Sequence, residues 1–234
     1  MRDIVLVHSP LVGPTSLAPT ADALERGGLR CHLPVAYVAG GEPPSWRDWS
    51  ERLIGALPPV DAPLIVGHSM GGLLAARLAG DLGAAGMICL DAAIPPETGE
   101  TPTVEPAFRA FLDTLPLRDG RLPRWADWWD LDVFENIGIP ADARAAAVRD
   151  MPRLPLRWFD DAFAMPDWSA ARRGFVRTSL TFVEEARKAE AMGWPVVRLK
   201  GIHLHPMTAP AETAEAILAC SAAMGLAPSI DPAP

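Results

Sequence analysis

The sequence has few cysteines and no long hydrophobic run. Its three cysteines, Cys31, Cys89 and Cys220, are odd in number and widely spaced. They fit neither a disulfide framework nor a zinc pattern, so we expect small buried hydrophobic side chains. No run approaches the 18 or more apolar residues of a membrane span. Because the first apolar run already begins at Ile4, we expect no signal peptide and a cytoplasmic protein that does not bind membranes.

Positive charge is also scarce. The 21 Lys and Arg residues face 29 Asp and Glu residues, and the net charge of -8 disfavours a nucleic-acid partner, which needs a cationic surface. No His or carboxylate cluster has metal-ligand spacing, and no Gly-rich loop has a nucleotide-binding pattern, so we expect neither a metal nor a cofactor. With 49% hydrophobic residues, the 234-residue chain can bury a sizeable core. The composition is compatible with a homo-oligomer.

Short apolar runs alternate with helical patterns along most of the chain. Continuous apolar runs such as Ile4-Val5-Leu6-Val7 indicate strands buried on both faces of a parallel sheet. This rhythm predicts an α/β fold with an open, mostly parallel sheet. The predicted strands are 4–7, 30–35, 64–66, 87–90, 174–178 and 195–199, and the predicted helices are 16–26, 46–57, 70–82, 182–192 and 211–224.

The rhythm breaks between residues 95 and 168. This stretch has no clear strand and many prolines, and it holds five of the eight tryptophans. We expect a mostly helical lid that interrupts a core made of residues 1–94 and 169–234. Insertions of this length usually cover a functional site.

One motif carries chemistry. Gly67-His68-Ser69-Met70-Gly71 follows a predicted strand directly and precedes a predicted helix, which is the setting of a G-x-S-x-G nucleophile elbow. Ser69 would sit on a strained turn that lifts its hydroxyl above the sheet, with small flanking residues to avoid clashes. The Met70 N–H could then face a developing oxyanion.

With this elbow, three further segments resemble the α/β-hydrolase superfamily, and the resemblance covers nearly the whole chain. The closest branch has small lids and includes plant methyl-ester esterases and hydroxynitrile lyases. The resemblance implies a six-stranded sheet that lacks the two leading strands of the full fold. It also implies Ser69 as nucleophile and His203 as its base, in preference to His205. The three segments are Leu6-Val7-His8-Ser9-Pro10, Cys89-Leu90-Asp91-Ala92-Ala93-Ile94-Pro95 and Gly201-Ile202-His203.

The third member of a triad departs from these relatives. The position where most of them carry an acid corresponds to Thr181. We favour Asp91, at the end of the strand after the elbow helix, as the acid that orients the imidazole. Glu184 or Glu185, or no functional acid, remain alternatives.

The oxyanion loop departs as well. Relatives use a backbone N–H at the position of Pro10, which has none. Leu11 could supply the donor, Ser9 could contribute its hydroxyl, or Met70 could act alone.

Three tryptophans of the expected lid share one helical face. Trp125, Trp128 and Trp129 are spaced i, i+3 and i+4. We expect Trp128 and Trp129 to line a large apolar substrate pocket.

These residues together predict a cofactor-independent serine hydrolase. Its small-molecule substrate would be an ester, lactone or thioester with a bulky apolar part. An alternative is a lyase, isomerase or cyclase that resembles hydroxynitrile lyases and uses the same residues for proton transfer. A ligand-binding pseudo-enzyme is a third hypothesis, since a fold alone does not determine a function.

Overall fold

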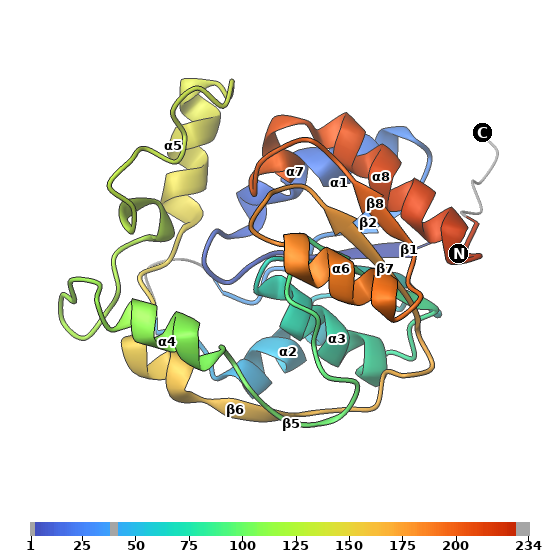
Figure 1. Ribbon diagram of the computed structural model, residues 1–234, viewed down its shortest axis with the longest axis horizontal. Coiled ribbons are helices and arrows are strands. Elements are labelled where there is room, and N and C mark those ends of the chain that lie inside the picture. Colours follow the sequence, from blue (N-terminus) through green and yellow to red (C-terminus); the bar gives the residue numbers. More distant parts are fainter. Residues whose placement is uncertain (1–2, 38–41, 228–234) are drawn as a thin grey trace.

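The computed structural model describes residues 3–37 and 42–227, which build a six-stranded sheet between two layers of helices (Figure 1). The strand order is β2-β1-β3-β4-β7-β8, and every neighbouring pair is parallel. The six predicted strands are confirmed. Their bounds are β1 (Asp3–Val7), β2 (Arg30–His32), β3 (Leu64–His68), β4 (Gly86–Leu90), β7 (Arg172–Arg177) and β8 (Val196–Arg198).

Helices cover both faces of this sheet (Figure 1). On one face lie α1 (Ala18–Arg26), α7 (His205–Thr208) and α8 (Pro210–Ala223). The other carries α2 (Trp46–Gly55), α3 (Gly71–Asp81) and α6 (Val183–Ala191). Ile4 and Leu6 pack into the first layer, and Val5 and Val7 pack into the second. Burial on both faces explains why the strands are continuous apolar runs.

Residues 95–168 add no strand to the main sheet but form a small sheet of their own. Strands β5 (Gly99–Pro102) and β6 (Ala162–Met165) pair antiparallel, so the prediction of a segment without strands is wrong. The sequence of β5, Gly-Glu-Thr-Pro, has no apolar alternation, and only its distant partner makes it a strand. The helices of this segment are α4 (Pro106–Leu112), η2 (Trp125–Asp127), α5 (Ala141–Asp150) and η3 (Leu156–Asp160).

Tryptophans fasten this segment to the core. Trp46 of α2 stacks on Trp158 with ring centroids 4.3 Å apart. The Trp158 Nε1–H donates to the Pro44 carbonyl (2.8 Å), and the Trp168 Nε1–H donates to the Pro96 carbonyl (2.7 Å). Trp158 therefore anchors the insertion beside α2, and Trp168 ties the two ends of the insertion to each other. Across residues 3–37 and 42–227, no helix has the length and apolar character needed to cross a membrane.

Candidate active site

Ser69 occupies a sharp turn between β3 and α3. Its φ of +56° lies in the left-handed region, which is strained for a residue with a side chain. The Ser69 N–H donates to the Leu90 carbonyl (3.2 Å) and fixes the turn against β4. The turn tolerates only glycine beside it: a Cβ on Gly67 would lie 2.5 Å from the Ala75 Cβ, and one on Gly71 would lie 2.4 Å from the Val7 carbonyl oxygen. The G-x-S-x-G spacing follows from these close approaches.

Asp91 follows β4 and also has a left-handed backbone, with φ +46°. Its side chain is fully buried. Oδ1 accepts hydrogen bonds from the backbone N–H groups of Thr178 and Ser179 (2.9 Å each), and Oδ2 accepts one from the Ser179 hydroxyl (2.6 Å). Oδ2 also lies 2.8 Å from His203 Nδ1. The carboxylate is thus held by four donors.

These donors control the charge of Asp91. Burial alone would raise its pKa, but hydrogen bonds from His203 and Ser179 and the charge of His203 outweigh burial and lower the pKa to about 2. An ionised carboxylate only accepts hydrogen bonds, so His203 carries its proton on Nδ1. In the neutral imidazole, Nε2 then carries no proton.

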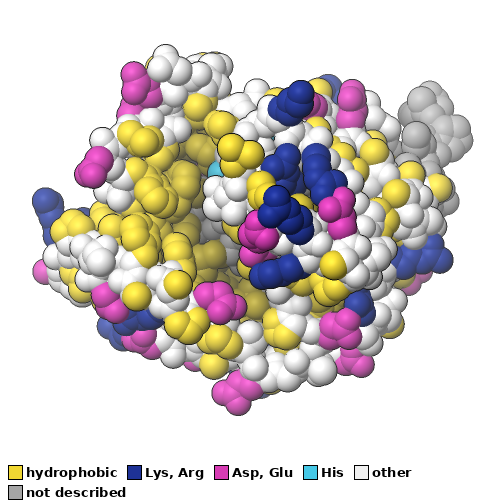
Figure 2. All heavy atoms as spheres, viewed as in Figure 1, with side chains coloured by type: hydrophobic (Ala, Val, Ile, Leu, Met, Phe, Trp, Pro, Cys, Tyr) yellow, Lys and Arg dark blue, Asp and Glu magenta, His cyan; other side chains and the backbone are white. Residues whose placement is uncertain are grey.

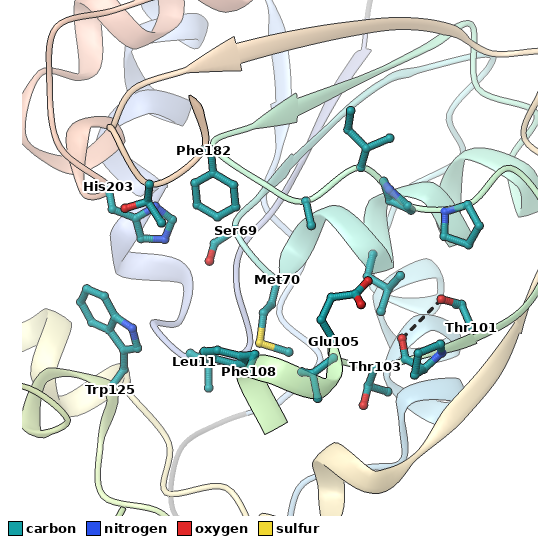
Figure 3. Close-up of a pocket in the computed structure, with 18 of the residues that line it drawn as sticks. Leu11, Ser69, Met70, Thr101, Thr103, Glu105, Phe108, Trp125, Phe182 and His203 are labelled. Carbon is teal, nitrogen blue, oxygen red and sulfur yellow. Dashed lines mark hydrogen bonds between the residues drawn. The ribbon is translucent and has the colours of Figure 1, made fainter. Parts of the chain in front are cut away.

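His203 lies in the loop between β8 and α7 and faces the same cavity as Ser69 (Figure 3). Phe182 stacks on its ring with centroids 5.5 Å apart, and Trp125 lies 6.1 Å away. No hydrogen bond joins Ser69 Oγ to the His203 ring within the described residues. Such bonds in ligand-free sites often tighten only when the substrate is bound.

A second histidine supports His203 from behind. His68 is fully buried, its ring centroid lies 4.7 Å from that of His203, and its Nε2–H donates to the His203 carbonyl (3.0 Å). Burial, and next the nearby His203, lower the pKa of His68 to about 3. His68 is therefore neutral at neutral pH.

The candidate oxyanion groups surround the elbow. Leu11 lines the cavity, but its N–H donates to Ser9 Oγ (3.3 Å). Ser9 is fully buried and lies outside the cavity wall. The Met70 N–H, at the start of α3, has no backbone acceptor in the described part of the chain. Of the Leu11 and Met70 N–H groups, only that of Leu11 is already bonded within the described residues.

The cavity has a volume of about 390 Å³, within the range of small-molecule sites. Figure 2 shows hydrophobic side chains gathered in a hollow that exposes a histidine. Its wall combines the elbow, the β4 and β7 loops and the insertion. The lining residues are Leu11, Ser69, Met70, Leu73, Ala93, Ile94, Pro95, Pro96, Thr101, Pro102, Thr103, Val104, Glu105, Phe108, Trp125, Trp129, Thr181, Phe182 and His203.

Some predicted residues lie elsewhere. Trp129 lines the cavity, but Trp128 does not: it is buried against Phe108 and Phe111, and its Nε1–H donates to the Pro123 carbonyl. The predicted helical face is wrong because η2 ends at Asp127, so Trp128 and Trp129 follow the turn instead of continuing a helix with Trp125. Trp125 takes its place in the wall.

The other candidate acid and base residues have partners of their own. Glu184 pairs with Arg187 and Glu185 with Lys188 along α6, and no hydrogen bond or ion pair joins either to His203 within the described residues. His205 Nε2 lies 3.0 Å from a Glu212 oxygen. In the part of the chain described, no three His, Cys, Asp or Glu residues gather as metal ligands would.

Phe182, Glu105 and Phe108 belong to the cavity and were missed in the sequence. Phe182 follows Thr181, the position at which relatives carry the acid, and this neighbourhood could have indicated that Phe182 lies near the site. Glu105 and Phe108 lie in the insertion, where no motif marks them.

Comparisons with known proteins agree with this architecture. The model of a family described as the alpha/beta hydrolase family matches residues 4–216. The sequence matches none of the curated proteins with which it was compared.

Several solved structures are similar over nearly their full length. Tomato methylketone synthase I, in complex with beta-ketoheptanoate, has a TM-score of 0.71 at 15% identity, covering 95% of this chain and 98% of its own. Polyneuridine aldehyde esterase has a TM-score of 0.70 at 18% identity, and the match covers 94% of this chain and 99% of its own. A pyrethroid hydrolase from Sphingobium faniae has a TM-score of 0.67 at 21% identity, and the match covers 95% of this chain and 98% of its own. At these identities the similarity establishes the fold.

Proposed function

Because the chain belongs to the alpha/beta hydrolase family, we propose that it is a cofactor-independent serine hydrolase of carboxylic esters, lactones or thioesters. The observation that carries this proposal is the Asp91–His203 hydrogen bond of 2.8 Å at the wall of the cavity into which Ser69 projects from its strained turn. These are the three groups that nucleophilic acyl transfer requires.

In the proposed mechanism, Ser69 Oγ attacks the substrate carbonyl carbon while His203 Nε2 takes the hydroxyl proton. Asp91 holds the Nδ1 proton and stabilises the imidazolium that forms. The Met70 N–H stabilises the oxyanion of the tetrahedral intermediate. When the intermediate collapses, His203 gives its proton to the leaving alcohol or thiol. Water, deprotonated by His203, then attacks the acyl-enzyme and releases the acid and Ser69.

The wall of the cavity supports a substrate with a bulky apolar part. Leu11, Leu73, Ile94 and two tryptophans face it, and residues of the 95–168 segment supply about half of the wall. We propose that this segment acts as the lid. Among similar structures, one is named an esterase and one a hydrolase, which favours the same reaction class.

A lyase-type reaction is the second candidate, and the oxyanion loop favours it. Pro10 has no N–H, and the Leu11 N–H is already bonded to Ser9 Oγ. Removing one oxyanion donor costs a hydrolase roughly 10²–10³-fold in turnover. Proton transfer between His203, Ser69 and a substrate carbon would not need that donor.

Hydrolysis of p-nitrophenyl butyrate and of a bulkier aromatic ester tests the proposal. We expect turnover that falls by at least about 10³-fold in Ser69→Ala and His203→Ala. Ser169→Ala, which removes an exposed hydroxyl outside the cavity wall, serves as the control with unchanged turnover. Ester turnover that survives in Ser69→Ala would contradict the proposal. Absence of turnover in the native protein would favour the lyase or a ligand-binding function.

A further inference from the structure

Among its described lining residues, the cavity has one acidic side chain and neither Lys nor Arg. Of these residues, only Glu105 and His203 carry titratable groups. Glu105 lies across the cavity from His203, on the wall formed by the insertion (Figure 3). Any substrate that extends from Ser69 toward the start of α4 meets this carboxylate.

The Glu105 carboxylate has no partner within the described residues. It occupies the position before α4, yet its side chain makes no capping hydrogen bond to that helix. The basic residue one turn later, Arg109, could have neutralised it. Instead, Arg109 binds Asp160 and Asp113, at 2.6 Å each. The negative charge therefore faces the cavity without a protein cation.

Aromatic rings line the same cavity as this carboxylate. Phe108 follows Glu105 by three residues, on the same side of the chain as it enters α4, and lines the same cavity. Trp125 and Trp129 also line the cavity, and Trp125 lies on the His203 side, away from Glu105 (Figure 3). A carboxylate in a cavity that also has aromatic rings in its wall favours substituted ammonium groups, because both the charge and the ring quadrupoles attract a cation. The same carboxylate repels carboxylates and phosphates.

From this arrangement we infer that Glu105 and Phe108 form a subsite that selects substrates by charge. The subsite accepts a substituted ammonium group, tolerates an uncharged one and rejects an anion. This inference rests on the proposed ester-hydrolase function and adds a substrate class to it: esters or thioesters that carry an ammonium group at the end remote from the scissile bond.

Matched esters test the subsite. In one series the acyl part of a p-nitrophenyl ester ends in trimethylammonium (trimethylammonio-butanoate), in its uncharged tert-butyl isostere, or in a carboxylate (the glutarate half-ester). In a second series the alcohol part is choline or its tert-butyl isostere. We expect kcat/KM for the cationic ester to exceed that of the isostere by about three- to tenfold in at least one series, and the anionic ester to be disfavoured similarly.

Variants assign the preference to Glu105. Glu105→Gln should bring the cationic-to-neutral ratio close to one. Glu100→Gln removes an equal charge from β5 outside the cavity wall and should leave both the ratio and the turnover unchanged. Rising salt should lower the native ratio, since Glu105 is exposed. A ratio near one in both series of the native enzyme, or a ratio unaffected by Glu105→Gln, would overturn the inference.

A binding measurement separates this inference from the proposed function. The affinities of choline and of its tert-butyl isostere can be compared, without any turnover, by the change in intrinsic tryptophan fluorescence, to which Trp125 and Trp129 in the cavity wall contribute. If no ester is hydrolysed but choline binds several-fold more tightly in a Glu105-dependent way, the hydrolase proposal fails and the subsite stands. If neutral esters are hydrolysed through Ser69 and choline shows no preference, the subsite fails alone.

Discussion

Replacing Asp91 with Asn should leave the fold intact and lower kcat by about 10⁴-fold. Oδ1 accepts two backbone N–H groups, from Thr178 and Ser179, so the amide oxygen must take that place. The amide NH₂ then points at His203 Nδ1, where Oδ2 now accepts a proton. Two donors cannot face each other, and His203 shifts its proton to Nε2. In that tautomer it cannot take the proton of Ser69.

The same substitution has a measurable effect on stability. A carboxyl group whose pKa falls from 3.8 in the unfolded chain to about 2 in the folded protein stabilises the fold by about 2 kcal/mol above pH 4. This contribution is fully present above the unfolded pKa and is lost as the pH falls from 4 toward 2. The free energy of unfolding of Asp91→Asn should therefore be about 2 kcal/mol lower than that of the native protein at neutral pH. It should also fall less steeply than the native value between pH 4 and 2.

Steady-state kinetics with p-nitrophenyl butyrate and urea unfolding at several pH values measure both effects. Glu185→Gln is the matched control, because it removes a half-buried carboxylate that is paired with Lys188 and lies outside the cavity wall, and its turnover should stay within about twofold of the native value. The reasoning is refuted if Asp91→Asn keeps more than a tenth of the native kcat. It is also refuted if kcat falls as far in Glu185→Gln as in Asp91→Asn.

Three further substitutions probe the elbow, its buried histidine and the anchor of the insertion. Gly71→Ala places a Cβ 2.4 Å from the Val7 carbonyl and should cost about 3 kcal/mol in urea unfolding, whereas Gly55→Ala, which meets open space, should change stability by less than about 1 kcal/mol. Burial lowers the pKa of His68 to about 3, so the unfolded chain takes up a proton below pH 6.5 that the folded protein excludes. As the pH falls from 7.5 to 5, the free energy of unfolding should therefore decrease by about 2 kcal/mol less in His68→Gln than in the native protein. An equal decrease in the two proteins would count against this explanation. Trp158→Ala should lower the free energy of unfolding by about 3–5 kcal/mol, and a loss below 1 kcal/mol would show that the stacked ring does not hold the insertion.

The sheet could be predicted because its strands are buried on both faces. Val5 and Leu6 contact opposite helix layers, so burial alone produces an uninterrupted apolar run that a reader of the sequence can recognise. Ser69 was recognisable for a similar reason, since its turn leaves room only for glycine at Gly67 and Gly71. Residues constrained by their near neighbours in the chain can therefore be recognised from short sequence patterns.

The insertion lacked such a signal. Strand β5 pairs with β6, which lies far along the chain, and Glu105 and Phe108 reach the cavity only because that pairing and α4 bring them there. Phe182 contacts His203 across two loops. Tertiary contacts of this kind are not encoded in any short motif, so the substrate pocket could not be derived before the fold was known.

The most direct test of the account is the reaction of the native protein with a fluorophosphonate probe, followed by peptide mass spectrometry to locate the adduct. The account predicts a single adduct on Ser69 that forms rapidly in the native protein and at least about 10³-fold more slowly in His203→Ala. No adduct, or an adduct on Ser69 that forms equally fast without His203, would contradict the claim that this serine is an activated nucleophile.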